Sequence, residues 1–145
     1  MRLALIGVGL IGASAAWAMK RGGVFETVSA FDLSAQSARK AVEMGIADTA
    51  ADTLEACVQG ADAVLVAVPV LAIETVMAQI EPFLRDETLV TDVGSVRGVV
   101  IEGARRALKE KFVNYAPVHP IAGGEMPGVD YADADLFMGA KAIST

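Results

Sequence analysis

The sequence is poor in several residue types, and each shortage excludes a class of protein. Among 145 residues there is one cysteine, Cys57, and one histidine, His119. A single cysteine cannot form an internal disulfide bond and leaves no second thiol for a metal cluster, so we expect no metal centre and a cytoplasmic location. Lys and Arg number only 12 against 18 Asp and Glu, which gives a net charge of −6. Because neutralising phosphates needs a clustered basic face, nucleic acid is not an expected partner.

Hydrophobic residues, in contrast, are abundant. They make up 54% of the chain, with 21% charged residues, and this composition excludes a disordered protein. A chain of this length buries roughly 70% of the surface that its unfolded form exposes, which is enough for one complete core. We therefore expect residues 1–145 to form a single domain.

The uncharged run from Leu3 to Met19 allows two interpretations. It lies between Arg2 and Lys20, like the apolar part of a secretory signal peptide, and that interpretation predicts a mature N-terminus near residues 16–20. The run has 17 residues, fewer than the ~20 that a membrane span needs, and three glycines interrupt it. We expect no membrane span and keep the secretory interpretation as a minor alternative.

Short apolar runs alternate with stretches of helical spacing along the chain, which is typical of parallel βαβ units. Several of the runs are apolar at almost every position, as in strands that helices cover on both faces. The pattern predicts an α/β fold with a doubly wound, mostly parallel sheet. The predicted strands are Arg2 to Ile6, Val28 to Asp32, Ala63 to Val68, Leu89 to Asp92, Val113 to Ala116 and Lys141 to Ser144, with a weaker element around Ala47 to Ala50.

Helix signals fill the intervals between these strands. Ser34 can cap a helix that Gly45 would close, and Cys57 lies in a predicted helix where its expected role is packing. A long stretch from Pro117 to Asp135, rich in Gly, Pro and Asp, is expected to be a functional loop. One buried helical stripe is predicted from Ile73, Val76, Met77, Ile80 and Leu84, with Pro82 ending the regular helix before Leu84.

A GxGxxG motif directly follows the first predicted strand and opens the first predicted helix. In this context Gly7 permits a tight turn, Gly9 lets a pyrophosphate approach the backbone at the positive end of the helix, and Gly12 lets helix and strand pack closely. The alternative, glycines that serve only helix–strand packing, is weakened by an acidic residue at the expected distance. We predict a dinucleotide site that includes the intervening residues Leu10 and Ile11.

That acidic residue is Asp32, 20 residues beyond Gly12 at the end of the second predicted strand. A carboxylate there can accept hydrogen bonds from a ribose 2′-hydroxyl, and it would repel a 2′-phosphate. The position therefore favours NAD over NADP as the cofactor. The alternative role for Asp32 is that of a helix N-cap.

In a doubly wound sheet of order 3-2-1-4-5-6, ligands lie over the carboxyl ends of the strands near the reversal of strand order. The residues just past those ends are the glycine loop, Val68-Pro69-Val70, the segment from Asp92 to Arg97, and Val118-His119-Pro120. We expect Val68 and Pro69 to contact the cofactor, and these segments to converge on its nicotinamide half.

His119 and Ser95 are the candidate catalytic residues. His119 is placed past a strand end on the cofactor side, and its unperturbed pKa of about 6.5 suits proton abstraction at neutral pH. Ser95 precedes a predicted helix, so it is equally well interpreted as an N-cap, and the two roles can coexist.

Together these residues resemble the prephenate/arogenate dehydrogenases of tyrosine biosynthesis. The resemblance is carried by the glycine motif, Asp32, and three further segments, and it spans the whole chain. GxGxxG is common to many enzymes, whereas GSV(K/R) followed by HPIAG is specific. The three segments read AVPV from Ala67 to Val70, TDVGSVR from Thr91 to Arg97, and HPIAG from His119 to Gly123, followed by Glu125 and Gly128-Val129.

The resemblance implies a Rossmann domain followed by a helical domain that forms a homodimer and completes the substrate pocket. It also implies NAD-dependent oxidative decarboxylation of prephenate or arogenate, with His119 as the base and Ser95 orienting the substrate hydroxyl. Gly123, Gly124 and Glu125 would belong to the substrate site. The family's polar TEKSG-like stretch is replaced here, since Gly124, Met126 and Pro127 stand in its place.

The resemblance further implies that the helical domain lies outside residues 1–145, so that this chain alone would bind NAD but turn over poorly. Two other functions remain open besides the secretory interpretation. One is another two-domain hydroxyacid or imine dehydrogenase, and the other is a non-catalytic NAD sensor.

Overall fold

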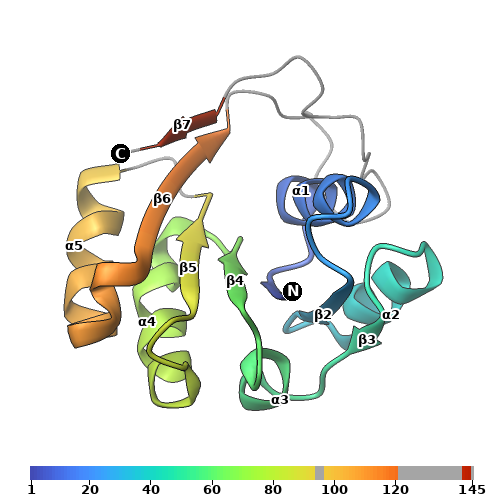
Figure 1. Ribbon diagram of the computed structural model, residues 1–145, viewed down its shortest axis with the longest axis horizontal. Helices are drawn as coiled ribbons and strands as arrows, with labels where there is room; N and C mark the ends of the chain where they lie inside the picture. Colours follow the sequence, from blue (N-terminus) through green and yellow to red (C-terminus); the bar gives the residue numbers. More distant parts are fainter. Residues whose placement is uncertain (94–96, 121–141, 145) are drawn as a thin grey trace.

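The computed structural model describes residues 1–93, 97–120 and 142–144, which form a single twisted sheet with helices on both faces (Figure 1). The strands are β1 (Arg2–Ile6), β2 (Thr27–Phe31), β3 (Thr49–Ala50), β4 (Ala63–Val66), β5 (Leu89–Asp92), β6 (Tyr115–Pro120) and β7 (Ala142–Ser144). Their order across the sheet is β3-β2-β1-β4-β5-β6-β7. Strands β1 to β6 are parallel, and β7 is antiparallel to β6. The predicted doubly wound α/β fold is confirmed.

The helices connect successive parallel strands, as right-handed βαβ crossovers require. They are α1 (Leu10–Arg21), α2 (Ala35–Glu43), α3 (Leu54–Val58), α4 (Val70–Ile80) and α5 (Arg97–Leu108), with short 3₁₀ segments η1 (Glu81–Phe83) and η2 (Lys109–Asn114). Figure 1 shows α4 and α5 side by side against one part of the sheet and α1 and α2 against the other.

Two hydrophobic cores lie on the two faces of the sheet, and β1 contributes to both. Leu3 and Leu5 pack with residues of α1 and α2, whereas Ala4 and Ile6 pack with residues of α3, α4 and α5. Successive side chains of a strand point to opposite faces, so a strand that feeds two cores must be apolar throughout. This requirement explains why the strand runs in the sequence show little alternation.

Most predicted strand boundaries agree with the structure within a residue, but the end of the fourth strand, both ends of the sixth and the start of the weaker element, which is β3, do not. The fourth strand ends at Val66 rather than Val68, because Pro69 provides no N–H for the ladder and α4 begins directly after it. The sixth strand begins at Tyr115 rather than Val113, since the preceding residues form η2.

The expectation that His119 lies just past a strand end is wrong. β6 continues through Pro120, and within it His119 pairs with Ile143 of β7. The strand is longer than predicted because an antiparallel partner from far along the chain extends it. For the same reason the predicted loop from Pro117 starts as a strand, and its remainder, 121–135, lies outside the described residues.

The local helix signals are confirmed where the structure describes them. The Ser34 hydroxyl accepts a hydrogen bond from the Ser37 N–H at 3.3 Å and caps α2, and Gly45, with φ +80°, follows the end of that helix. α4 ends at Ile80, before Pro82. The predicted cap Ser95 lies outside the described residues. Within the described part of the chain, no helix is both long enough and apolar enough to span a membrane.

Candidate functional site

A groove of about 1210 Å³ lies at the carboxyl ends of β1, β2 and β4. Its floor is the glycine loop, residues 7–12, which connects β1 to α1. One wall comes from the end of β2 and the β3–α3 connection, and the other from the β4–α4 connection and the exposed side of α4. The lining residues are Ile6 to Gly12, Phe31 to Leu33, Asp52 to Leu54, Ala67 to Pro69, Ala72, Thr75, Val76, Gln79 and Val93.

The first and third glycines of the loop are required by the protein's own packing. Gly7 has φ +93°, and a Cβ there would lie 2.5 Å from the carbonyl oxygen of Ala67. A Cβ on Gly12 would lie 2.5 Å from the Ala67 Cβ and 2.8 Å from the Gly7 carbonyl oxygen. These two glycines bring β1, α1 and the end of β4 together, so any side chain at either position forces a shift of backbone.

The second glycine, Gly9, differs from the other two. It has φ −101°, which any residue can adopt, and a Cβ there would meet no atom within 4 Å in the part of the chain that the structure describes. Gly9 is the N-cap of α1, which has neither a side-chain cap nor an acidic residue in its first turn. The first N–H groups of a helix have no partner within it and carry its positive partial charge. An open, uncapped helix start within a groove can therefore bind an anion through its backbone.

Asp32 is half-buried at the end of β2 and accepts two backbone hydrogen bonds. Its Oδ2 accepts from the Val8 N–H at 2.7 Å and its Oδ1 from the Ser34 N–H at 2.8 Å. The alternative role of Asp32 as a helix N-cap is wrong, because Ser34 caps α2. Its carboxylate thus lies in the groove next to the glycine loop, and each oxygen retains a lone pair for a further donor.

Both walls of the groove contain residues that the sequence motifs did not predict for the site. Leu33, which is 98% exposed, and Leu54 lie on the wall beyond Asp32, whereas Gln79 and Val76, predicted only as part of a buried stripe, lie on the α4 wall. Leu33 directly follows Asp32, but a single leucine in a turn gives no signal of its function. Its exposure, known only from the structure, makes it a candidate for contact with a flat apolar ligand group.

At the other end of the groove, the structure brings Val68 and Pro69 next to the glycine loop, together with Leu10, Ile11 and Val93. The remaining predicted site residues are not placed there by the structure. Ser95, Gly123, Gly124 and Glu125 lie outside the described residues, and for His119 the structure describes the backbone position in β6.

Asp92 was expected to line the groove, but it is not among the lining residues. Its side chain is buried, and its carboxylate accepts a hydrogen bond from the Tyr115 hydroxyl of β6. Val90, two residues earlier and on the same face of β5, belongs to the core formed with α4 and α5. Asp92 therefore joins β5 to β6 on the side of these helices.

The parallel sheet, the glycine loop and the carboxylate at the end of β2 define a dinucleotide-binding domain of the Rossmann type. Residues 15–145 match the family described as "Prephenate dehydrogenase, nucleotide-binding domain". The chain belongs to this family.

Curated relatives and solved structures agree with this assignment. The chain is 37% identical over 143 residues to a cyclohexadienyl dehydrogenase of Zymomonas mobilis and 33% identical over 145 residues to a prephenate dehydrogenase of Bacillus subtilis. These alignments cover 99% and 97% of this chain but only 48% and 38% of the relatives, so the chain spans less than half of their length.

Among solved structures, the prephenate dehydrogenase from A. aeolicus in complex with hydroxyphenyl propionate and NAD+ superposes with a TM-score of 0.90 at 30% identity. A Synechocystis arogenate dehydrogenase superposes equally well, also with a TM-score of 0.90 at 30% identity. Both superpositions cover 100% of this chain and 50% of the other chain.

Proposed function

We propose that this chain is the NAD-binding part of a prephenate or arogenate dehydrogenase. The observation that carries the proposal is Gly9, a glycine that no contact among the described residues requires, at an uncapped helix start inside the groove. Such a position is explained by a ligand whose phosphates approach the backbone more closely than a Cβ would allow. The relative crystallised with NAD+ supports the choice of dinucleotide.

In this proposal, successive parts of the groove would bind successive parts of NAD. The N–H groups of Gly9, Leu10 and Ile11 would bind the pyrophosphate, and the Asp32 carboxylate would accept hydrogen bonds from the adenosine ribose. Leu33 would cover the adenine, while Val68 and Pro69 would contact the nicotinamide half. Asp32 favours NAD because a 2′-phosphate would meet its negative charge.

The reaction we propose for the complete protein is the oxidative decarboxylation of prephenate or arogenate, a step of tyrosine biosynthesis. When bound, NAD accepts the hydride that leaves the ring carbon bearing the hydroxyl group. His119 would take the proton of that hydroxyl as the hydride leaves, the bond to the departing carbon dioxide would supply the electron pair that makes the ring aromatic, and the proton would return to the phenol oxygen. A neutral imidazole is a competent base, and Ser95 would orient the hydroxyl toward it. Gly123, Gly124 and Glu125 would contribute to substrate binding.

We further propose that the complete protein carries a second, helical domain, through which it forms a homodimer in the cytoplasm. The relatives are about twice as long as this chain, which leaves room for such a domain. The domain would complete the substrate pocket, so that residues 1–145 alone would bind NAD and turn over poorly.

Steady-state kinetics of the complete protein test the proposal. With NAD present, prephenate and arogenate are offered separately, and reduced cofactor is followed by absorbance. We expect turnover of at least one of the two. NAD binding without turnover of either would contradict the dehydrogenase and favour an NAD sensor, while absence of NAD binding would contradict the cofactor site itself.

A further inference from the structure

Both oxygens of the Asp32 carboxylate are already bound to backbone N–H groups of the protein. One N–H belongs to Val8 in the glycine loop, 24 residues earlier in the chain, and the other to Ser34 in the β2–α2 turn. A side chain that only served a bound ribose would not need to fasten two loops of its own chain. The two hydrogen bonds therefore indicate that Asp32 also has a role in the structure of the site before any ligand binds.

The hydrogen bond to Val8 continues the pairing of β1 with β2 beyond the ends of the two strands. Their parallel register ends at Ile6 and Phe31, and the Gly7 N–H donates to the Phe31 carbonyl at 2.9 Å. At the next position the Asp32 side chain, rather than a backbone carbonyl, accepts the N–H of Val8 at 2.7 Å. Two successive N–H groups of the glycine loop are thus held against β2.

This attachment decides which N–H groups of the loop remain for a ligand. With Gly7 and Val8 bound to β2, and the Val8 side chain buried in the core, the loop turns outward at Gly9. The N–H groups from Gly9 onward then start α1 at the groove. A site whose donors are held in place before binding loses less entropy when the ligand arrives.

We infer that Asp32 is a positioning residue for the pyrophosphate site, in addition to the ribose contact that we propose for it. This role for Asp32 rests on the proposed function, because it assumes that the groove binds a dinucleotide. It has a specific consequence: loss of the Asp32 carboxylate weakens the binding of pyrophosphate groups even when the ligand has no ribose hydroxyl to recognise.

Simple electrostatics makes the opposite prediction. A carboxylate close to an anionic pyrophosphate repels it, so a substitution that removes the charge would strengthen binding if Asp32 did not hold the loop. Asp32→Asn is the informative variant because it keeps the size of the side chain. It supplies only one acceptor oxygen for the two N–H groups of Val8 and Ser34, and its amide NH₂ cannot accept the other.

The binding experiment compares wild type and Asp32→Asn with ADP and 2′,3′-dideoxy-ADP as ligands, by calorimetry on the purified chain. Dideoxy-ADP retains the pyrophosphate and lacks both ribose hydroxyls. We expect Asp32→Asn to bind dideoxy-ADP about fivefold to tenfold more weakly than wild type, the effect of losing one hydrogen bond to a charged group. Equal or tighter binding by Asp32→Asn would overturn the inference.

Asp48→Asn is a matched control. Asp48 also accepts a backbone hydrogen bond, from the Val28 N–H at 2.8 Å, but it does so near the start of β2, away from the groove. Its substitution therefore removes a similar carboxylate contact without touching the glycine loop. We expect its affinity for both nucleotides to equal that of wild type.

A second measurement needs no ligand. Amide hydrogen exchange of the free chain reports whether the Val8 N–H is held, because exchange requires its hydrogen bond to open. We expect exchange at Val8 to be at least tenfold faster in Asp32→Ala, which has no acceptor oxygen for the Val8 N–H, than in wild type and in Asp48→Asn. Unchanged exchange at Val8 would refute the attachment, whereas failure of wild type to bind ADP or NAD would refute the proposed function alone.

Discussion

At the scale of single residues, one motif contains glycines with different physical roles. Gly7 and Gly12 are required by contacts with Ala67, which a Cβ would approach to 2.5 Å in both cases. Gly9 has no such contact with residues 1–93, 97–120 or 142–144 and is explained by the proposed ligand. Substitutions at Gly7 or Gly12 should therefore change the stability of the fold, whereas a substitution at Gly9 should change ligand binding.

Gly9→Ala and Gly12→Ala test this separation. We expect Gly9→Ala to change the free energy of unfolding by less than about 0.5 kcal/mol, because its methyl group enters open space. It should still raise the Kd for NAD at least about tenfold, since the methyl group occupies the path of the pyrophosphate. Gly12→Ala should lower the free energy of unfolding by about 1–3 kcal/mol through overpacking. Urea unfolding and NAD titration measure both, and unchanged NAD affinity in Gly9→Ala would contradict the pyrophosphate assignment.

Cys57 gives a second prediction at this scale. Burial raises the pKa of its thiol from the ordinary 9.0 to about 11. Below pH 9 the thiol is neutral in both the folded and the unfolded chain. Between pH 9 and about pH 11 the unfolded chain loses the proton first, so folding stability falls with rising pH, by at most about 1.4 kcal/mol per unit.

Urea unfolding at pH 8 and pH 10 measures this effect, with Cys57→Ala as the control. The variant lacks the titrating group and should lose less stability than wild type over the same interval. Equal losses in the two proteins would show that the thiol is not the group responsible.

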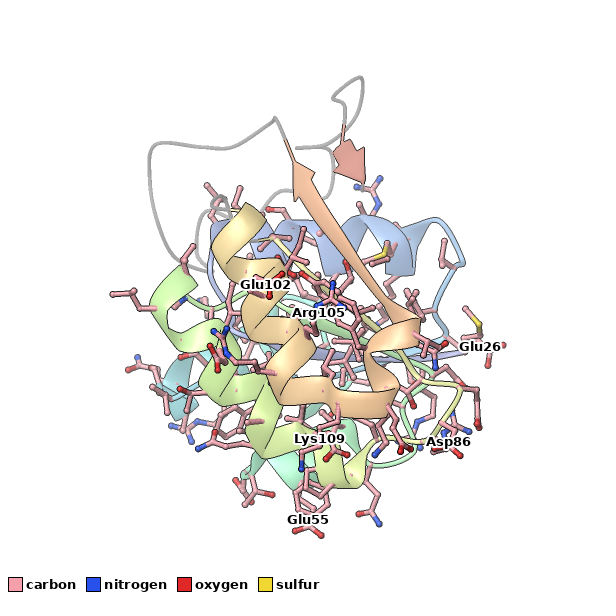
Figure 2. All side chains as sticks on the ribbon, turned by 90° about the vertical axis from the view of Figure 1, so that its left-hand side faces the viewer. Glu26, Glu55, Asp86, Glu102, Arg105 and Lys109 are labelled. Carbon is pink, nitrogen blue, oxygen red and sulfur yellow. The ribbon has the colours of Figure 1, made fainter. Side chains whose placement is uncertain are left out.

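At the scale of elements, α4 and α5 contact each other in two ways. Charged side chains pair on their solvent-exposed surface, and apolar side chains pack beneath them against the sheet. Glu74 of α4 and Arg106 of α5 form a pair at 2.7 Å, but both side chains are about half exposed, so the pair adds little stability. Figure 2 shows Glu102 and Arg105 on the outer side of α5, where their 3.9 Å contact is equally open to solvent. The positions of these helices are therefore decided mainly by the buried residues beneath them.

The ion pair between Glu81 and Lys111 is the exception and supports a prediction. Their side chains are 17% and 18% exposed, and Lys111 Nζ donates to Glu81 Oε2 at 2.8 Å and to the Glu81 carbonyl at 2.5 Å. The hydrogen bond from Lys111 holds the pKa of Glu81 below its ordinary value of 4.5. The carboxylate therefore stabilises the fold above that pH, and the contribution is lost as the pH falls through the lowered pKa.

We expect Glu81→Gln to lower the free energy of unfolding by about 1 kcal/mol at pH 7, and by less near pH 4. Urea unfolding at both pH values measures the difference. Glu55→Gln is the control, because Glu55 lies exposed on the surface of the molecule (Figure 2). A loss for Glu81→Gln that is no larger than the loss for Glu55→Gln would contradict the assigned contribution.

At the scale of the whole molecule, the groove results from the reversal of strand order between β1 and β4. From β1 the chain proceeds outward to β2 and β3, and then returns to place β4 on the other side of β1. The connections that leave β1 and β4 therefore turn to opposite faces of the sheet, and a crevice remains between them. The glycine loop and the Val68-Pro69 segment line this crevice.

Replacement of the proposed base tests the reaction at this scale. In the complete protein, His119→Asn should lower the turnover number by about 10²-fold or more while the Kd for NAD stays nearly unchanged, because the base acts on the substrate and not on the cofactor. Steady-state kinetics and NAD titration of the same preparation measure both values. Unaltered turnover would exclude His119 as the base.

The features that could be predicted from the sequence alone depend on neighbouring residues. The apolar runs predicted the strands, Ser34 and Gly45 predicted the limits of α2, and GxGxxG with Asp32 predicted where a dinucleotide would bind. These signals are local because backbone conformation, capping and turn geometry involve residues a few positions apart.

The features that join distant segments could be known only from the folded structure. It showed that β6 extends to Pro120 because β7 pairs with it, that Asp32 holds Val8, and that Asp92 is buried against Tyr115 rather than lining the groove. It also separated Gly9 from Gly12, since the difference lies in the distance to Ala67 across the sheet. Each of these features depends on contacts between residues more than 20 positions apart in the chain. Patterns of spacing in the sequence do not indicate which distant residues come into contact.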